Sequence, residues 1–226
     1  MSEAKRIVLV GASGLIGSAV IAATVGRSDM RLTALARREF ALPAGARMEL
    51  LVADPSEWSG LIASARADVL VIALGTTWRA AGRDEAAFRA VDEKLVLDCA
   101  RAAKSAGVPR CIAVSSVGAD AGARNFYLRV KGEVEAALSV LDFDRLDILR
   151  PGLLRGPRNE RRPAERLAML ASPITDLLLH GGLRRYRSVT AETVARAILN
   201  LSTAGPTGRF VHEHDAIVRA SRASGD

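Results

Sequence analysis

Long apolar runs are absent from this chain of 226 residues. No uninterrupted stretch approaches the roughly 18 apolar residues that a membrane-spanning helix needs, so we expect no membrane span and no membrane partner. Residues 1–6 lead directly into a short strand-like run, without the apolar segment and cleavage site of a secretory signal. On this basis we expect a cytoplasmic protein.

Cysteine, lysine and aromatic residues are also scarce. The two cysteines, Cys99 and Cys111, fall in expected core elements, so we predict reduced, buried thiols. Lysine occurs only at positions 5, 94, 104 and 131, and arginine supplies most of the net charge of +7. The arginines are scattered except at 155–166, and no aromatic residues interleave with them as in a nucleic-acid stacking platform. Nucleic-acid binding is therefore not expected.

Two further site types lack their residues. His212 and His214 could face the same side of a strand, but the third and fourth ligands of a metal site are missing from the sequence. No glycine-rich run ends in Lys-Ser or Lys-Thr, which argues against a P-loop kinase or ATPase. We therefore expect no bound metal and no P-loop chemistry.

Short apolar segments alternate with helical ones. The strongest helical pattern covers 85–106, where Phe88, Val91, Leu95, Cys99, Ala102 and Ala106 form one apolar stripe. Strands that are apolar on both faces and separated by helices predict a Rossmann-type doubly wound parallel sheet with helices on both faces. The expected strands are 7–10, 32–36, 48–53, 69–74, 111–114, 146–149 and 209–212.

A glycine turn links the first strand to a helix expected at 15–25. Gly11 permits the turn, Gly14 lets backbone approach a pyrophosphate, and Gly17 lets the helix pack against the strand. The unpaired N–H groups at the helix start face an anion, and the helix dipole adds to the attraction. This strand, turn and helix together predict a dinucleotide site.

The ends of the next strands carry candidate cofactor contacts. Arg37 stands where an NAD-preferring unit usually has a carboxylate, and a guanidinium suits a 2′-phosphate, so we predict NADP(H); a surface arginine pair is the alternative. Asp54 could face the adenine or simply cap a helix that has Pro55 at its first position. Gly75 could let backbone pass beside the cofactor or form a plain turn.

Tyr127 and Lys131 are one helical turn apart, on the same face as Val130 and Val134. A lysine beside a buried stripe is unusual, because an unpaired ammonium is costly to bury. A free tyrosine has a pKa of about 10, and a nearby ammonium favours the phenolate, so Tyr127 could exchange a proton with a carbonyl or alcohol. Ser116 would hold the same oxygen, and Lys131 would also grip the nicotinamide ribose.

These residues together resemble the short-chain dehydrogenase/reductase superfamily. Within it the chain is similar to the HIV Tat-interacting oxidoreductase-like proteins, which are atypical, NADP(H)-binding members. The likeness covers roughly residues 5–203. The matching blocks are 74–77 (Leu-Gly-Thr-Thr), 114–116 (Val-Ser-Ser), 118–120 (Gly-Ala-Asp), 127–135 (Tyr-Leu-Arg-Val-Lys-Gly-Glu-Val-Glu), 143–145 (Phe-Asp-Arg) and 150–152 (Arg-Pro-Gly).

The resemblance implies that Tyr127 and Lys131 are catalytic and also touch the nicotinamide ribose, and it implies a further set of cofactor contacts. Animal relatives carry polar residues at the positions of Leu15 and Ile16 and a lysine at that of Val117, which bears on cofactor contacts and substrate preference. The implied contacts are Ser13, Gly14, Leu15 and Ile16 at the pyrophosphate turn, Arg37 and Arg38 at the 2′-phosphate, Leu74 and Gly75 beside the cofactor, Leu154 near the nicotinamide amide, and Arg162.

We therefore expect one NAD(P)-binding domain over 1–226. Residues 5–154 would form the nucleotide-binding core, and 155–203 a small substrate-side cap with helices near 164–179 and 191–201. Residues 221–226 would form a frayed tail. The expected function is an NADP(H)-dependent oxidoreductase acting on a small carbonyl or alcohol. The alternatives are an NADP(H)-sensing binding protein and a sugar-nucleotide epimerase or dehydratase; a homodimer is one open oligomeric state.

Overall fold

The computed structural model describes residues 4–156 and 179–222. Seven strands form one sheet in the order β3-β2-β1-β4-β5-β6-β9, and every neighbouring pair is parallel. This confirms the predicted doubly wound sheet and each of its expected strands. The strands are β1 (Lys5–Val10), β2 (Met30–Ala36), β3 (Met48–Val52), β4 (Val69–Ile72), β5 (Arg110–Val114), β6 (Arg145–Leu149) and β9 (Gly208–His212).

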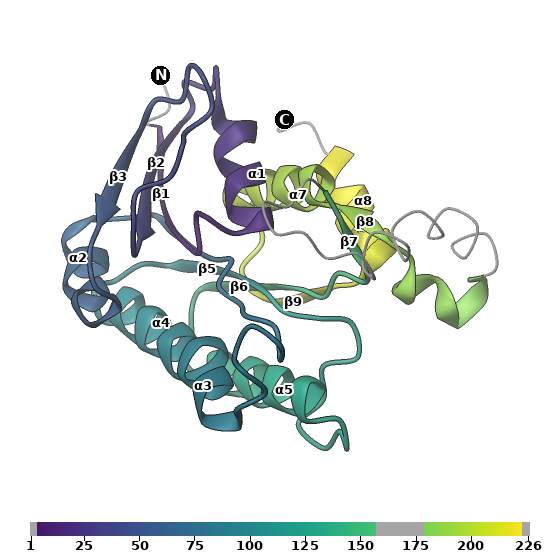
Figure 1. The fold of residues 1–226 in the computed structure, drawn as a ribbon. Helices are drawn as coiled ribbons and strands as arrows, with labels where there is room; N and C mark the ends of the chain where they lie inside the picture. Colours follow the sequence, from purple (N-terminus) through teal and green to yellow (C-terminus); the bar gives the residue numbers. More distant parts are fainter. Residues whose placement is uncertain (1–3, 157–178, 223–226) are drawn as a thin grey trace.

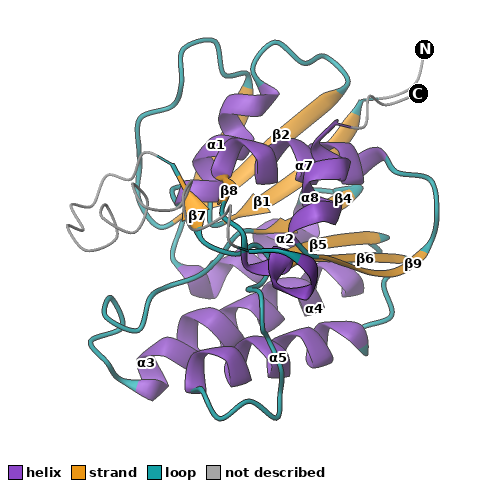
Figure 2. Ribbon diagram, turned by 90° about the vertical axis from the view of Figure 1, so that its right-hand side faces the viewer, coloured by secondary structure: helices purple, strands orange, loops and turns teal. Residues whose placement is uncertain are grey.

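Helices cover both faces of the sheet, as Figures 1 and 2 show. One face carries α1 (Leu15–Thr24), α7 (Ala191–Thr203) and α8 (His214–Arg222). The other carries α2 (Trp58–Ser64), α3 (Glu85–Arg89), α4 (Val96–Ser105) and α5 (Phe126–Ser139). Each layer buries its own apolar cluster against the sheet, because successive strand side chains point to opposite faces. The strand C-termini and the helix starts consequently share one edge.

The helical stretch expected at 85–106 contains a π-helical turn at Ala90–Leu95, between α3 and α4. A π turn adds one residue to the helix and rotates everything beyond it. Val91 and Leu95 are therefore only partly buried, whereas Asp92 and Val96 face the core. In the predicted apolar stripe Phe88 and Cys99 are buried, and Leu95 and Ala102 pack partly buried against the same core, whereas Val91 does not join it and Ala106 is exposed. Asp92, within the π turn, is a carboxylate inside the protein.

The C-terminal part differs from the expected cap. The helix expected at 164–179 falls almost wholly outside the described residues. The helix expected at 191–201 is α7, which packs on α1 and the sheet as part of a core layer. Two short strands, β7 (Leu154–Arg155) and β8 (Val189–Thr190), pair as a separate parallel ribbon. A 3-10 helix, η3 (Gly181–Tyr186), precedes β8.

The chain ends and the cysteines complete the fold. Of the tail expected at 221–226, the first two residues belong to α8, and the others lie outside the described residues. Cys99 and Cys111 are free and buried, as predicted. Burial raises the pKa of the Cys99 thiol to about 12 and that of Cys111 further. No helix within 4–156 and 179–222 combines the length and the apolar character that crossing a bilayer requires.

Candidate active site

The glycine turn after β1 has the geometry that its sequence predicts. Gly11 has a φ of +86°, and a Cβ there would lie 2.5 Å from the Ala73 carbonyl group. A Cβ on Gly17 would lie 2.1 Å from the Gly11 oxygen, so neither position accepts a side chain. The α1 N-cap, Gly14, gives its helix no side-chain hydrogen bond. The first N–H groups of α1 therefore remain available to an anion.

The residues of this turn differ in what they can offer a cofactor. Ser13 and Gly14 are exposed, and Leu15 is half-buried. Ile16 is buried and packs its side chain into the core under α1. A contact from Ile16 would therefore come from its backbone, whereas Ser13 presents both a hydroxyl and an N–H group.

Arg37 and Arg38 follow the last residue of β2 and are both exposed. Ala36 before them is buried, so the chain leaves the core at this step. Across the described ranges, neither guanidinium makes a hydrogen bond or ion pair. Both are therefore free to meet a phosphate at the edge where the strand C-termini lie.

Asp54 takes the structural role that was its alternative. It is the N-cap of the 3-10 turn Pro55–Glu57, and its Oδ1 accepts hydrogen bonds from the Ser56 backbone (2.9 Å) and hydroxyl (2.6 Å). The hydroxyl and N–H of Ser56 lower the pKa of Asp54. Glu57 completes a capping box by accepting from the Asp54 N–H at 3.1 Å.

Lys131 lies inside the protein and is paired with a carboxylate that the sequence did not reveal. Its Nζ lies 2.7 Å from Asp92 Oδ1, and the two side chains are 7% and 0% exposed. The Thr76 N–H donates to Asp92 Oδ2 at 2.7 Å. Burial opposes the charged amine, but the Asp92 carboxylate outweighs it and raises the pKa of Lys131. Lys131 is therefore an ammonium at neutral pH.

Gly75 leaves the space beside this ion pair open. The residue is exposed, and a Cβ placed on it would lie 3.6 Å from Asp92 Oδ1 and 3.9 Å from Lys131 Nζ. Leu74 before it is half-buried and packs on the core. The loop after β4 thus brings bare backbone next to the ammonium, where a ribose could approach.

Tyr127 lies in the first turn of α5, one turn before Lys131, and the Lys131 Nζ is 6.0 Å from the centre of its ring. Asn125 caps the helix by accepting from the Leu128 N–H at 3.1 Å. The Tyr127 ring packs edge-on against the fully buried Phe88, with centroids 5.7 Å apart. The cap and this contact hold the phenol in one place while the side chain stays partly exposed.

An aromatic cluster continues from Tyr127. Trp78 packs against Phe126 at 5.2 Å and against Phe88 at 6.5 Å, and it is 38% exposed. The other tryptophan, Trp58, is buried, and its indole N–H donates to the Ala53 carbonyl at 3.1 Å. The sequence alone could not separate these two roles. Trp78 thus shares the partner Phe88 with Tyr127 and is a partly open member of the cluster.

The two serines after β5 have different partners. Ser115 donates to Glu135 Oε1 at 2.5 Å, and Glu135 also receives the Arg150 guanidinium at 2.5 Å. Hydrogen bonding to Glu135 raises the pKa of Arg150. The hydroxyl of Ser116 has only a 3.4 Å contact with the Val117 carbonyl. Ser116 is therefore the serine left free for a ligand, whereas Ser115 ties β5 to α5.

Sequence reasoning missed Asp92, Glu135 and Arg150. Glu135 is buried one turn beyond Lys131 on α5, a position that the residue spacing could have shown. Asp92 lies four residues after Phe88 on the same helix face, but spacing alone could not pair it with Lys131 on another helix. Arg150, partly buried, starts the Arg-Pro-Gly block.

The remaining described candidates, Leu154, His212 and His214, pack or pair with residues other than Tyr127. Leu154 belongs to β7 and packs with the α1 and α7 cluster. Arg162 lies outside the described residues. His212 Nε2 lies 2.7 Å from Asp147 Oδ1, and His214 Nδ1 lies 2.9 Å from Asp215 Oδ1. No cluster of metal-ligating side chains occurs in the described part of the chain.

Comparison with known proteins places the site in context. Residues 11–204 match a family described as NAD(P)H-binding. A protein of Aspergillus niger named Fmp52, mitochondrial, is 33% identical over 202 residues, covering 86% of both chains. The Candida albicans protein of the same name is 38% identical over 157 residues, covering 67% of this chain and 68% of that one.

These names overturn the expected localisation. The relatives are called mitochondrial, so the expectation of a cytoplasmic protein is wrong. That expectation rested on a missing secretory segment, which does not distinguish one compartment inside the cell from another. The relatives also bear the name Fmp52 rather than that of the Tat-interacting proteins.

Solved structures share the fold at low identity. The Bordetella bronchiseptica enzyme WbmH in complex with NAD+ has a TM-score of 0.70 at 16% identity, covering 93% of this chain and 76% of that one. The UDP-glucose 4-epimerase of Thermotoga maritima has a TM-score of 0.70 at 16% identity, covering 92% and 76%. With the family match and the fungal relatives, the chain belongs to the NAD(P)H-binding family, alongside the Fmp52 proteins of fungi.

Proposed function

We propose that this protein is an NADP(H)-dependent oxidoreductase of the atypical short-chain dehydrogenase/reductase type, as the Tat-interacting oxidoreductase-like proteins are. Its substrate would be a small carbonyl compound or alcohol. The observation that carries the proposal is the arrangement on α5, where a partly exposed phenol precedes a buried, carboxylate-paired ammonium by one turn. A buried lysine is rarely needed for stability alone, because its charge can be buried only together with a second charge, here the carboxylate of Asp92.

The cofactor is expected to run along the edge formed by the strand C-termini. The turn from Gly11 to Gly17 fits the pyrophosphate, because close packing excludes side chains there and N–H groups stay available. Arg37 and Arg38 suit a 2′-phosphate, which favours NADP(H) over NAD(H). Lys131, beside the open backbone of Gly75, would bind the nicotinamide ribose.

When bound, the reduced nicotinamide supplies a hydride to the carbonyl carbon of the substrate. Tyr127 gives its hydroxyl proton to the carbonyl oxygen at the same time, and it takes that proton back in the reverse reaction. Ser116 orients the same oxygen through its free hydroxyl. Lys131 holds positive charge near the phenol, and Asp92 keeps that ammonium charged and fixed.

Parallel titration of the purified protein with NADPH and NADH tests the cofactor, and a 340 nm screen against aldehydes, ketones and quinones tests the activity. We expect tighter binding of NADPH, and consumption of NADPH with at least one substrate. The Tyr127→Phe variant keeps the contact with Phe88, so it should bind NADPH normally and lose turnover by about 10²-fold or more.

Two results would count against the proposal. Unchanged turnover in Tyr127→Phe would remove the phenol from the chemistry. Tight NADPH binding with no turnover across the whole screen would favour the sensing role, in which occupancy of the dinucleotide site alone matters.

A further inference from the structure

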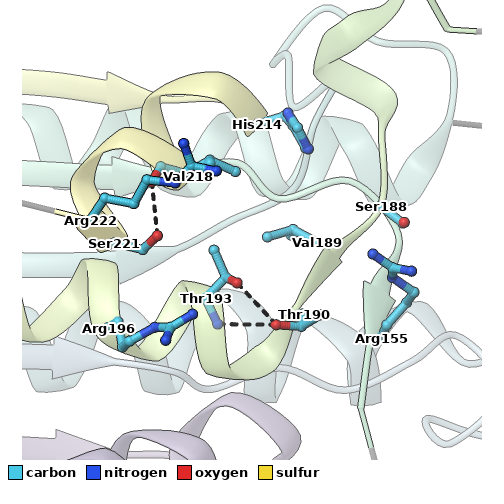
Figure 3. A pocket seen from close by; sticks show the side chains of 10 residues that line it. All are labelled: Arg155, Ser188, Val189, Thr190, Thr193, Arg196, His214, Val218, Ser221 and Arg222. Atoms are coloured by element: carbon cyan, nitrogen blue, oxygen red, sulfur yellow. Dashed lines mark hydrogen bonds between the residues drawn. The ribbon is translucent and has the colours of Figure 1, made fainter. Parts of the chain in front are cut away.

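A cavity of about 500 Å³ lies away from Tyr127, between the β7–β8 ribbon and helices α7 and α8 (Figure 3). Its volume falls in the range of small-molecule sites. The described residues that line it are Arg155, Ser188, Val189, Thr190, Thr193, Arg196, His214, Val218, Ser221 and Arg222. None of the roles assigned above uses this cavity.

The charge of its wall is of one sign. Arg155, Arg196 and Arg222 line the cavity together with His214, and no carboxylate is among the described lining residues. Asp215, which contacts His214 Nδ1 at 2.9 Å, is an acidic neighbour of the wall. Guanidinium groups that converge on one space repel each other and raise the local concentration of anions there.

The three guanidinium groups also lack partners. Within 4–156 and 179–222, none of them makes a hydrogen bond or an ion pair. In Arg155 one of the guanidinium nitrogen atoms, Nε, is also buried, and it has no hydrogen-bond acceptor. A buried donor without an acceptor costs free energy in a folded protein and calls for an explanation. An anion in this cavity would offset the charge of Arg155 through the guanidinium nitrogens at the wall, since the buried Nε itself has no open space beside it.

The hydroxyl groups on the wall support the same ligand. Thr190 and Thr193, on successive turns at the start of α7, share one hydrogen bond of 3.0 Å between their hydroxyl oxygens. The pair has two hydroxyl hydrogens, and this bond uses one of them. The other can point to an oxygen of a ligand. Arginines and hydroxyls together match the several oxygens of a phosphate group.

The cavity has room for more than a bare inorganic ion. The volume far exceeds that of one phosphate, and Val189 and Val218 add an apolar part to the wall. We propose that this cavity is a binding site for a small organic phosphate, held by Arg155, Arg196 and Arg222, and separate from the dinucleotide site.

The separation follows from the chain. Arg155 and Thr190 are paired residues of the β7–β8 ribbon. The next residue, Gly156, touches the first residue of α1, since a Cβ on it would lie 2.8 Å from Leu15 Cδ1. The ribbon therefore stands between the cavity and the glycine turn. The two sites are neighbours with different lining residues, and the proposal does not rest on the proposed activity.

The test is calorimetric titration of the full chain with fructose 1,6-bisphosphate, citrate and inorganic phosphate, at physiological ionic strength and with saturating NADP+. The variant Arg196→Gln/Arg222→Gln removes two exposed lining charges and leaves the core intact. Arg219→Gln is the matched control, because Arg219 is exposed on the same helix as Arg222 but does not line the cavity.

We expect saturable binding of fructose 1,6-bisphosphate in the presence of NADP+, tighter than that of citrate or inorganic phosphate. The double variant should weaken it at least tenfold, while Arg219→Gln and the affinity for NADPH stay unchanged. Absence of saturable binding overturns the proposal. Displacement of the bisphosphate by NADP+ also overturns the proposal, because it assigns the bound bisphosphate to the glycine turn. Equal weakening by Arg219→Gln overturns it too, because binding would then depend only on the net charge of the protein.

Discussion

Lys131 and Asp92 form an ion pair of 2.7 Å in which both side chains are almost fully buried. The pair joins α5 to the π-helical turn, and Asp92 continues to the Thr76 backbone at 2.7 Å. The Asp92 carboxylate thus holds both the Lys131 ammonium and the loop after β4 in place. The nicotinamide end of a cofactor would lie where this ammonium and this loop meet. π turns inside helices are frequent at functional positions, and Asp92 lies within this one.

Asp92→Asn should destabilise the protein strongly. The variant leaves the Lys131 ammonium buried without a counter-charge, so we expect the free energy of unfolding to fall by about 3–5 kcal/mol in urea denaturation. Asp98→Asn is the control, because Asp98 pairs with the exposed Lys94 and should cost about 0–1 kcal/mol. Adding Lys131→Met to Asp92→Asn should restore part of the loss. Similar losses for Asp92→Asn and Asp98→Asn would contradict a buried pair.

Arg37→Gln should change cofactor preference and little else. Losing charge-assisted hydrogen bonds to a 2′-phosphate costs about 1.5–3 kcal/mol, so we expect the Kd for NADPH to rise by roughly 10–100-fold. The Kd for NADH should stay the same, since NADH has no phosphate there. Arg31→Gln, also exposed on β2, is the matched control. Equal weakening of both cofactors would assign Arg37 a different role.

Substitution of the two adjacent serines should have different effects: that of Ser115 on stability and that of Ser116 on activity. Ser115→Ala removes a hydrogen bond to the buried Glu135 and should lower the free energy of unfolding by about 1–3 kcal/mol. Ser116→Ala removes only a weak 3.4 Å contact, so thermal unfolding should not change while kcat falls about tenfold or more. If Ser115→Ala instead proves stable but has a low kcat, the Ser115 hydroxyl is the one that contacts the substrate, and the prediction is contradicted.

Stability should depend on pH through Asp68. Burial alone would raise its pKa, but the Arg6 N–H at 2.8 Å and the Arg6 guanidinium outweigh burial and hold the pKa below the ordinary 3.8. A lowered pKa in the folded state gives stability that is present above pH 3.8 and is lost as the pH falls through the folded value. Thermal unfolding should show a difference between wild type and Asp68→Asn that is largest near neutrality and shrinks in acid. A difference independent of pH would contradict this.

The sheet could be predicted from the sequence, and the environment of the lysine could not. Every strand of the seven-stranded sheet was found, because runs such as Ile7 to Val10 are apolar on both faces, as a parallel sheet with two covered faces requires. Tyr127 and Lys131 were found because a charge beside an apolar stripe breaks a local rule. Asp92 was missed because a search for apolar spacing passes over a carboxylate, and its partner Lys131 comes from another helix.

Long-range partners were likewise beyond sequence spacing. Ser115, Glu135 and Arg150 come together from β5, α5 and the end of β6 only after the sheet has formed. The pairing of β7 with β8, which creates the arginine-lined cavity, joins residues on either side of a long intervening segment. Two-residue strands give too short a pattern to be recognised in advance.

A crystal structure of the protein with NADP+ tests the central claim most directly. We predict the pyrophosphate on the Gly11–Gly17 turn, a nicotinamide ribose hydroxyl within hydrogen-bonding distance of Lys131 Nζ, and the Tyr127 hydroxyl facing the C4 atom of the nicotinamide. A nicotinamide bound on the far side of the loop at Gly75, with Tyr127 and Lys131 out of its reach, would contradict the account.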